Sequence, residues 1–160
     1  MENMKKISTT KGFTALVDNE DYPILSRYKW YAHSNKRGHV YPRTWTGKGG
    51  QRMFMHAMIL GEYKGIVDHI NGNGLDNRKA NLRIATYSEN GANRRISKKN
   101  NTSGFKGVSW YKPHKKWRAG ICFDGKCKHL GYFDSKEEAA EAYNKAAKGV
   151  FGRFALLNRI

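Results

Sequence analysis

The stretch Val67-Asp68-His69-Ile70-Asn71-Gly72-Asn73 constrains the fold of this chain more than any other segment. It ends a predicted strand over residues 65–69 and enters a loop that is too polar to be buried core. The carboxylate of Asp68 can bind a hard divalent cation through oxygen. The imidazole of His69 can accept a proton from water near neutral pH. Side by side at a strand end, these two residues favour metal-assisted hydrolysis of a phosphodiester bond.

Asparagines follow this pair, and one of them offers a further metal ligand. A second strand is predicted over residues 81–86, followed by a helix to about residue 96 that Thr86 or Ser88 can cap. Asn90 falls in the first turns of this helix, where its amide oxygen is a neutral ligand for the metal. Asn71 and Asn77 fit better as turn formers than as ligands.

Residues 67–91 resemble the HNH endonuclease family, in particular the homing-type members from phages and introns. The resemblance rests on four motifs: Asp68-His69, the Asn-rich and Gly-rich turn 71–77, Asn81-Leu82-Arg83 and Asn90. It implies a ββα-metal core, spanning about residues 50–96, in which His69 is the general base and Asp68 and Asn90 bind one divalent metal, most often magnesium. Asn81 would orient the base or brace the loop. Asn90 stands where the nominal pattern has a final histidine, a substitution common in the homing branch.

A Met-His pair, Met55-His56, precedes a short apolar helix that Gly61 should end. This arrangement also recurs in the homing branch, and the resemblance places His56 near the site. There it would touch a phosphate or support the metal shell. A partly buried structural histidine is the alternative interpretation.

The charge of the chain predicts a polyanionic partner. It carries 30 Lys and Arg against 13 Asp and Glu, for a net charge of +17. Each phosphate contact releases condensed counterions, so binding to double-stranded DNA should weaken steeply with salt. Solubility or loose attraction to a membrane surface would also suit such a charge. However, no apolar run approaches the roughly 20 residues that span a bilayer. The N-terminus lacks a signal-peptide pattern, which predicts a cytoplasmic protein.

The two cysteines, Cys122 and Cys127, are too few for a disulfide scaffold. They flank Asp124-Gly125, a dipeptide typical of a two-residue hairpin turn, and would face each other across it. We expect them to be reduced strand residues of a cytosolic protein. A zinc site with His114 or His129 lacks the usual Cys-x2-Cys spacing.

Three segments separate along the chain. Residues 1–93 form the predicted nuclease domain, with a β-rich N-terminal module. Residues 94–102 form a basic linker in which Arg94 and Arg95 could grip the DNA backbone. Within residues 103–160, three segments show the alternating pattern of β-strands. Helical periodicity then begins at residue 136, where Ser135 and Glu138 match a capping box.

The last segment resembles the DNA-binding domain of plant ethylene-response factors, the apetala-two family, which also occurs fused to HNH endonucleases. The matching motifs are Gly107-Val108, Trp117-Arg118-Ala119, Leu130-Gly131-Tyr132-Phe133, Glu137-Glu138-Ala139-Ala140 with Ala142-Tyr143, and Leu157-Asn158. The resemblance implies a three-stranded sheet that lies in the major groove. The implied contacts are Lys106, Trp110, Tyr111, Lys112, Arg118 and Lys128. Ser109 replaces an arginine of the plant members, so their target sequence does not transfer. Trp117 alternates with Arg118, which favours the core.

The sequence therefore predicts an α+β protein: a β-rich module with a ββα-metal core, then a three-stranded antiparallel sheet packed on one helix. The predicted function is a metal-dependent DNA endonuclease that nicks one strand per protomer, so a double-strand break would need a homodimer or a second visit. A catalytically silent DNA-binding regulator is the main alternative. An RNA-binding protein is a third class, although stacking modules of the recognition-motif type are not visible.

Overall fold

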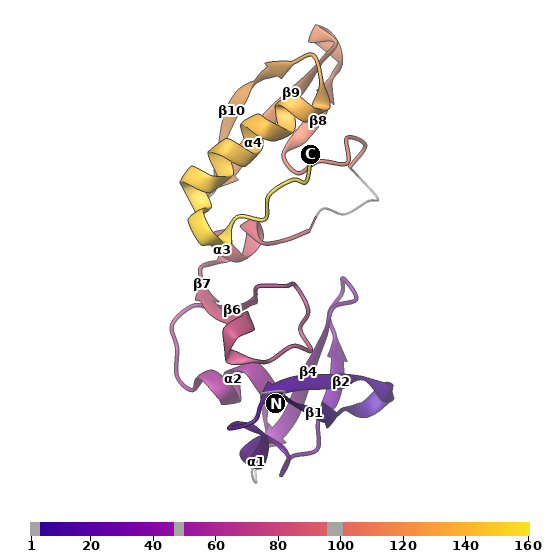
Figure 1. Ribbon diagram of the computed structural model, residues 1–160, viewed down its shortest axis with the longest axis vertical. Helices are drawn as coiled ribbons and strands as arrows, with labels where there is room; N and C mark the ends of the chain where they lie inside the picture. The colour runs from indigo at the N-terminus through magenta and orange to yellow at the C-terminus, as the bar shows by residue number, and fades with distance from the viewer. Residues whose placement is uncertain (1–3, 47–49, 96–100) are drawn as a thin grey trace. The chain divides into compact units, whose positions relative to one another are not determined.

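The computed structural model describes residues 4–46, 50–95 and 101–160, and the chain divides into two compact units, Met1–Ala85 and Thr86–Ile160 (Figure 1). Each unit combines antiparallel strands with helices, which confirms the predicted α+β class. The division falls between Ala85 and Thr86, earlier than the predicted end of the nuclease domain at residue 93. The predicted linker lies partly outside the described residues, at 96–100.

The first unit contains three small antiparallel sheets. One is a hairpin of β1 (Met4–Ser8) and β2 (Thr14–Asp18), joined through the 3-10 turn Thr10–Gly12. The second is a meander of β3 (Tyr31–Ser34), β4 (Val40–Thr46) and β5 (Gln51–Phe54). The third pairs β6 (Ile66–His69) with β7 (Leu82–Ala85). Two short helices, α1 (Tyr22–Leu25) and α2 (Met55–Leu60), lie between these strands in the sequence.

The apolar core of the first unit is built around Trp30, which is almost fully buried. The Trp30 indole donates its Nε1–H to the carbonyl of Leu25 at 2.8 Å, so this large side chain is buried without an unpaired polar group. Met55, at the start of α2, packs into the same cluster as Val17 from β2. The short helix is thereby fixed by its first residue, and His56 follows directly on from it.

The loop between β6 and β7 docks on the first hairpin. Leu16 of β2 bridges in parallel to Asp76 of the loop, with backbone hydrogen bonds from Leu16 N to Leu75 O and from Asn77 N to Leu16 O, both 2.8 Å. In a third hydrogen bond, the backbone N–H of Lys79 donates to Asp18 Oδ2 at 2.7 Å. These contacts fix a mostly polar loop against β2.

The second unit is a sheet in the order β10-β9-β8 with one long helix against it (Figure 1). The strands are β8 (Val108–Tyr111), β9 (Lys116–Phe123) and β10 (Lys126–Phe133), and the helix is α4 (Lys136–Phe151). The predicted capping box at its start is present, with Ser135 Oγ accepting from Glu138 N and a Glu138 carboxylate oxygen accepting from Ser135 N. The three-stranded sheet on one helix is therefore confirmed.

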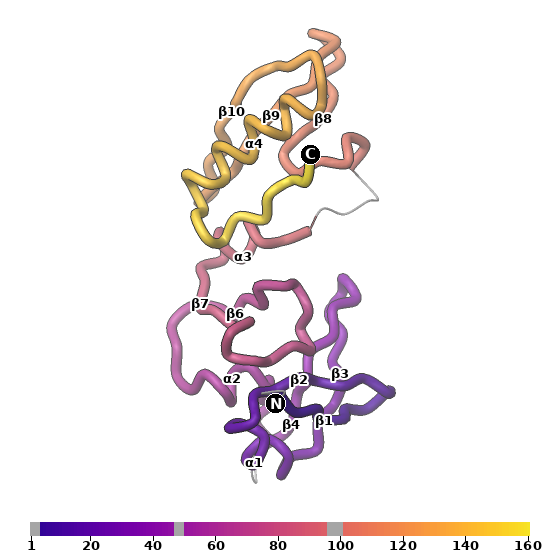
Figure 2. The backbone as a smooth tube through the Cα atoms, in the orientation of Figure 1, coloured from indigo at the N-terminus to yellow at the C-terminus, as the bar shows by residue number. Residues whose placement is uncertain are grey.

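Small side chains let α4 lie close to the sheet. Ala139 and Ala140 of the helix are fully buried with Ala119 of β9. Trp117 packs on the same cluster, as its alternation with Arg118 predicted. After α4 the chain passes the 3-10 turn Gly152–Phe154 and runs back beside the helix α3 (Tyr87–Ala92), as Figure 2 shows. The helix α3 therefore belongs to the second unit.

The expectation of reduced cysteines is wrong. Cys122 and Cys127 are direct partners across the β9–β10 hairpin, as predicted, but they form a disulfide. Opposite residues of an antiparallel pair bring their β-carbons close, which places both sulfur atoms within bonding distance. The disulfide also removes both thiols from the zinc site that we considered with His114 or His129. Among the described residues, no helix is both long and apolar enough to cross a membrane.

Candidate active site

The Asp68-His69 pair lies at the end of β6 and is almost completely buried in the first unit. Neighbouring residues of a strand point to opposite faces, so the carboxylate and the imidazole meet different surroundings. Asp68 is opposite Arg83 of β7, and His69 is opposite Leu82. A short two-stranded ladder therefore holds both side chains that the sequence singled out.

Arg83 forms an ion pair with Asp68. The guanidinium Nε lies 2.8 Å and Nη2 2.7 Å from Asp68 Oδ2, and both side chains are nearly inaccessible to water. A buried charge is costly unless an opposite charge and hydrogen bonds compensate it, and Arg83 supplies both. The buried carboxylate thus has a charged hydrogen-bonding partner of its own in the fold.

The imidazole of His69 lies among polar and aromatic side chains. Its Nε2 is 3.5 Å from Oδ1 of Asn77, a fully buried side chain. Tyr41 of β4 lies edge-on, with ring centroids 5.7 Å apart. Burial lowers the pKa of His69 below its ordinary value of 6.5, and the Asn77 hydrogen bond and the charges of Asp68 and Asp76 oppose this only partly. A neutral imidazole at pH 7 is the form that a general base needs.

The contact with Asn77 favours one tautomer of His69. The amide oxygen accepts, so Nε2 carries the proton, and the basic lone pair then lies on Nδ1. The Asn77 amide is itself oriented, since its Nδ2 donates to the carbonyl of Gly74 at 3.2 Å. Asn77 therefore fixes the orientation of the His69 ring and the position of its proton. A carboxylate or a backbone carbonyl plays the same part beside many catalytic histidines.

His56 is brought to the same place from helix α2. Its ring stacks on Phe54 with an interplanar angle of 9° and meets the ring of His69 at a centroid distance of 5.3 Å. Within the described residues, the buried Nδ1 of His56 has no hydrogen-bond partner. Burial, and then the neighbouring His69, lower the pKa of His56 to about 4. His56 is thus a neutral, half-buried neighbour of the proposed base.

A ring of amides shapes the loop that follows. The Asn81 side chain accepts from Asn71 N at 3.0 Å and donates to Asn71 Oδ1 at 3.1 Å and to the Asp76 carbonyl at 2.8 Å. Asn71 in turn donates to the carboxylate of Asp76, which a bidentate Arg78 neutralises at 2.8 and 2.7 Å. Of the two roles implied for Asn81, these contacts favour bracing of the loop.

Three residues of this region were not given a role at the site from the sequence. Asn77 was assigned to a turn, because nothing in the local pattern shows that its side chain points inward to His69. Tyr41 lies in β4, and only the tertiary fold brings it to the site. Arg83 could have been found, since pairing the predicted strands 65–69 and 81–86 as neighbours places it opposite Asp68.

The donor set suits a cation that keeps most of its water. Within residues 4–46, 50–95 and 101–160, no three His, Cys, Asp or Glu side chains are arranged to hold a metal ion. Mg²⁺ needs no such cage, since one or two protein oxygens and substrate phosphates complete its shell. The carboxylate of Asp68 fits as the single anionic ligand, provided that the cation shares it with Arg83 or replaces that guanidinium.

The remaining candidates lie in the second unit. Asn90 lies in α3, whose capping box at Thr86 and Glu89 is formed. Arg94 and Arg95 follow the helix and are exposed. In contrast, the Lys106 ammonium is half-buried and donates to backbone carbonyls of Gly91, Ala92 and Arg94, which leaves it poorly placed for DNA.

The predicted DNA contacts of the sheet divide between its two faces. Tyr111 and Arg118 lie on the face away from α4, where the Arg118 guanidinium is 5.6 Å from the centre of the Tyr111 ring. Tyr132, opposite Arg118, completes this face with the rings of His114 and His129 at 4.5 Å. Trp110 and Lys128 pair with Trp117 and Ile121, so they border the helix side. Lys112 is exposed in the 3-10 turn after β8.

Comparison with known proteins gives three similarities. The family model described as HNH endonuclease matches residues 57–92, which include Asp68, His69, Asn81 and Asn90. A protein of Acanthamoeba polyphaga mimivirus, named as an HNH endonuclease, is 34% identical over 154 residues, covering 94% of this chain and 77% of the relative. Protein 3.8 of Escherichia phage T7 is 39% identical over 90 residues, covering 55% of this chain and 74% of that protein.

Proposed function

Because the chain belongs to the HNH endonuclease family, we propose that it is a metal-dependent DNA endonuclease that hydrolyses phosphodiester bonds. One observation carries the proposal: a buried histidine with a lowered pKa is held by Asn77 beside a buried carboxylate. Structural histidines are common, but an oriented neutral imidazole next to the carboxylate of Asp68 is what proton abstraction from water at a phosphate requires.

In this proposal His69 removes the proton of the attacking water through Nδ1, while its Nε2–H stays with Asn77. The imidazolium that forms would be stabilised by the negative charges of Asp68 and Asp76, both of which favour the protonated ring. Tyr41 and His56 limit the water around it. Asn81 keeps the loop in shape, so that Asn77 stays in place.

Asp68 and Asn90 are the proposed ligands of one divalent metal, which we take to be magnesium. When bound, it would stabilise negative charge on the scissile phosphate and on the leaving oxygen. Asp68 would contribute the anionic oxygen and Asn90 a neutral one. The assignment of Asn90 rests on its place in the family motif and in α3.

We further propose that the C-terminal unit, with its likeness to ethylene-response-factor domains, locates the site on double-stranded DNA. The face formed by Tyr111, Arg118 and Tyr132 would enter the major groove, since it is exposed, cationic and not covered by α4. Lys112, Arg94 and Arg95 would contact phosphates. Trp110 and Lys128 could reach the backbone only from the edge of the sheet.

A catalytically silent DNA-binding regulator is the second candidate, and the Asp68–Arg83 ion pair is the observation that favours it. A buried carboxylate already neutralised by a guanidinium needs no metal to be stable. This candidate predicts DNA binding with no metal-dependent cleavage.

If the chain is a nuclease, one general base per chain means that one protomer should nick one strand. A double-strand break would then need two protomers.

The test is the conversion of supercoiled plasmid to open circles with Mg²⁺. The native chain should nick the plasmid, whereas His69→Ala and the native chain with chelator should not. His39→Ala is the matched control, because His39 is an exposed histidine of the same unit, and it should nick like the native chain. Equal nicking by His69→Ala would remove His69 as the base. Binding of a wide set of DNA sequences without any nicking would favour the silent regulator.

A further inference from the structure

The helix that carries Asn90 is too short to be stable alone. It spans only Tyr87–Ala92, less than two turns, and isolated helices of this length do not persist in water. Its N-terminus is satisfied by the Thr86 and Glu89 capping box. The position of Asn90 therefore depends on whatever holds the other end of the helix.

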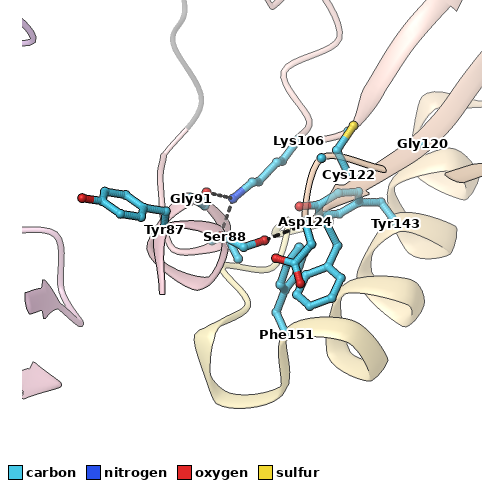
Figure 3. A pocket seen from close by; sticks show the side chains of 13 residues that line it. Tyr87, Ser88, Gly91, Lys106, Gly120, Cys122, Asp124, Tyr143 and Phe151 are labelled. Atoms are coloured by element: carbon cyan, nitrogen blue, oxygen red, sulfur yellow. Dashed lines mark hydrogen bonds between the residues drawn. The ribbon is translucent and has the colours of Figure 1, made fainter. Parts of the chain in front are cut away.

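A lysine of the second unit holds that end. The ammonium of Lys106 donates to the carbonyl oxygen of Gly91 at 3.3 Å and to that of Ala92 (Figure 3). It also donates to the carbonyl oxygen of Arg94 at 3.0 Å. The last carbonyls of a helix have no partner within the helix and carry the negative end of its dipole. Lys106 thus acts as a charged C-cap supplied by a residue remote in sequence.

The backbone of Lys106 is itself fixed by hydrogen bonds. Asn158 accepts from Lys106 N at 2.7 Å and donates to Lys106 O at 3.1 Å. Asn144 of α4 then holds Asn158, through Asn158 N to Asn144 Oδ1 at 2.7 Å and Asn144 Nδ2 to Asn158 O at 2.9 Å. A continuous set of contacts therefore runs from α4 through Asn158 and Lys106 to α3.

Two further contacts keep α3 against the same unit. Asp124, in the β9–β10 turn, donates its backbone N–H to Ser88 Oγ at 3.3 Å (Figure 3). Leu156 donates its N–H to the carbonyl of Ala92, a buried residue, at 3.2 Å. Beside Lys106, α3 and the sheet leave a cavity of about 390 Å³. Because α3 is only six residues long, the loss of Lys106 should be felt along the whole helix.

We propose that Lys106 is a positioning residue of the nuclease: it fixes α3, and with it the metal ligand Asn90, to the sheet unit that binds DNA. The inference rests on the proposed function, which assigns Asn90 to the metal. It replaces the expectation that Lys106 touches DNA. The ammonium already donates to three backbone carbonyls of its own unit, and burial, with the charge of Arg94, lowers its pKa to about 8.

The experiment compares the full-length chain with Lys106→Met, which keeps the length of the side chain and removes its donors. Lys145→Met is the matched control, an exposed lysine of α4 with the same loss of charge. Lys106→Arg should restore the native behaviour, because a guanidinium can donate to the same carbonyls. Should Lys106→Met fail to fold, Lys106→Gln, which keeps one donor group, takes its place in every measurement.

Four quantities decide the outcome. In Lys106→Met, amide hydrogen exchange of α3 should accelerate about tenfold. The Mn²⁺ concentration that half-saturates the protein–DNA complex, followed by electron paramagnetic resonance, should rise about tenfold, as should the Mg²⁺ requirement for nicking. Affinity for a random-sequence duplex should change by less than about twofold, with the same salt dependence. Lys145→Met should leave α3 exchange and Mn²⁺ binding unchanged.

Several results would overturn the inference. Weaker DNA binding with a smaller salt dependence, but native α3 exchange and Mn²⁺ binding, would make Lys106 a phosphate contact. Faster exchange with native Mn²⁺ binding would make it a purely structural cap. If the native chain neither binds Mn²⁺ nor nicks DNA, the proposed function fails and the metal role of Asn90 with it. The exchange data would still show separately whether Lys106 holds α3.

Discussion

Arg83 and Asp68 face each other across β6 and β7, and the guanidinium places two of its nitrogens within 2.8 Å of one carboxylate oxygen. Both side chains are buried, so the pair is screened little by water or salt. Arg83 is the positive charge that compensates the buried carboxylate of Asp68. In an enzyme that binds Mg²⁺ there, the two cations must share or exchange that oxygen.

Replacing Arg83 with Met should therefore make folding depend on metal. The variant leaves Asp68 as an uncompensated buried charge, which costs about 3 kcal/mol of unfolding free energy. Mg²⁺ should recover part of this loss, because an ion that binds only the folded state stabilises it. Urea unfolding with and without Mg²⁺ measures both effects. Arg37→Met, at an exposed arginine, should show neither, and equal Mg²⁺ stabilisation of the native and Arg83 variant proteins would argue against a metal at Asp68.

Substitution of Asn77 should impair nicking without changing DNA binding. Asn77→Ala removes the acceptor that fixes the proton on Nε2 of His69, and the loss of such an orienting group typically lowers activity about 10- to 100-fold. Asn77→Asp keeps an acceptor and adds a negative charge. It should retain more activity and move the acid limb of the pH–rate profile to higher pH, because the charge favours protonated His69.

Asn77 is also buried, so stability has to be measured in parallel. Nicking rates compared at temperatures well below each melting point separate the two effects. If both variants fell equally in activity, with unchanged pH profiles, the amide would serve only the Gly74 turn that it also contacts.

The pH dependence of nicking should follow the depressed pKa of His69. Because the general base must be neutral, activity is lost as the pH falls through that pKa, which burial places below 6.5. The acid limb measured at saturating DNA and Mg²⁺ should therefore have its midpoint below pH 6.5. A midpoint above that value would show that the charges of Asp68 and Asp76 outweigh desolvation, contrary to the surroundings of the ring.

The stability of the first unit should fall in acid because of His56. Its pKa is about 4 in the folded state against 6.5 ordinarily, so between these values the unfolded chain binds a proton that the folded chain does not. Stability is therefore lost progressively as the pH falls from 6.5 to 4, by up to about 3 kcal/mol.

His56→Phe should reduce this loss, since the substituted ring cannot titrate and can stack on Phe54 in the same way. The check is urea unfolding of both proteins between pH 4 and 6.5. The difference between their unfolding free energies should shift in favour of the variant as the pH falls. Parallel curves would mean that His56 titrates normally in the fold.

Local pattern was enough to predict the two strands that carry Asp68 and Arg83, and the helix that Ser135 caps. In these segments alternation, turn residues and a capping box all point to the same structure. The strand Met4–Ser8 was missed, because it alternates little and its pairing with β2 decides its conformation. The role of Asn77 was hidden for a related reason: a buried amide and a turn amide look alike in sequence.

The end of the helix α3 could not be predicted from the local sequence. Its start is encoded beside it, in Thr86 and Glu89, but its end depends on Lys106 and Leu156. A pattern that predicts a helix does not say which sheet the helix will join. The disulfide is a similar case, because the hairpin correctly places Cys122 opposite Cys127 while the expected cellular compartment argued for thiols.

The hydrogen bonds that Asn81 makes within its loop all join neutral amides and backbone groups, and the carboxylate of Asp76 in the same loop pairs with Arg78. Hydrogen bonds between uncharged groups are indifferent to ionic strength, whereas attraction of the cationic surface to DNA is not. In a salt titration, the fraction of protein bound to DNA and the cleavage rate of the bound protein should therefore respond differently. Rising salt would dissociate the protein from DNA, while the protein molecules that remain bound would cleave the DNA at an unchanged rate.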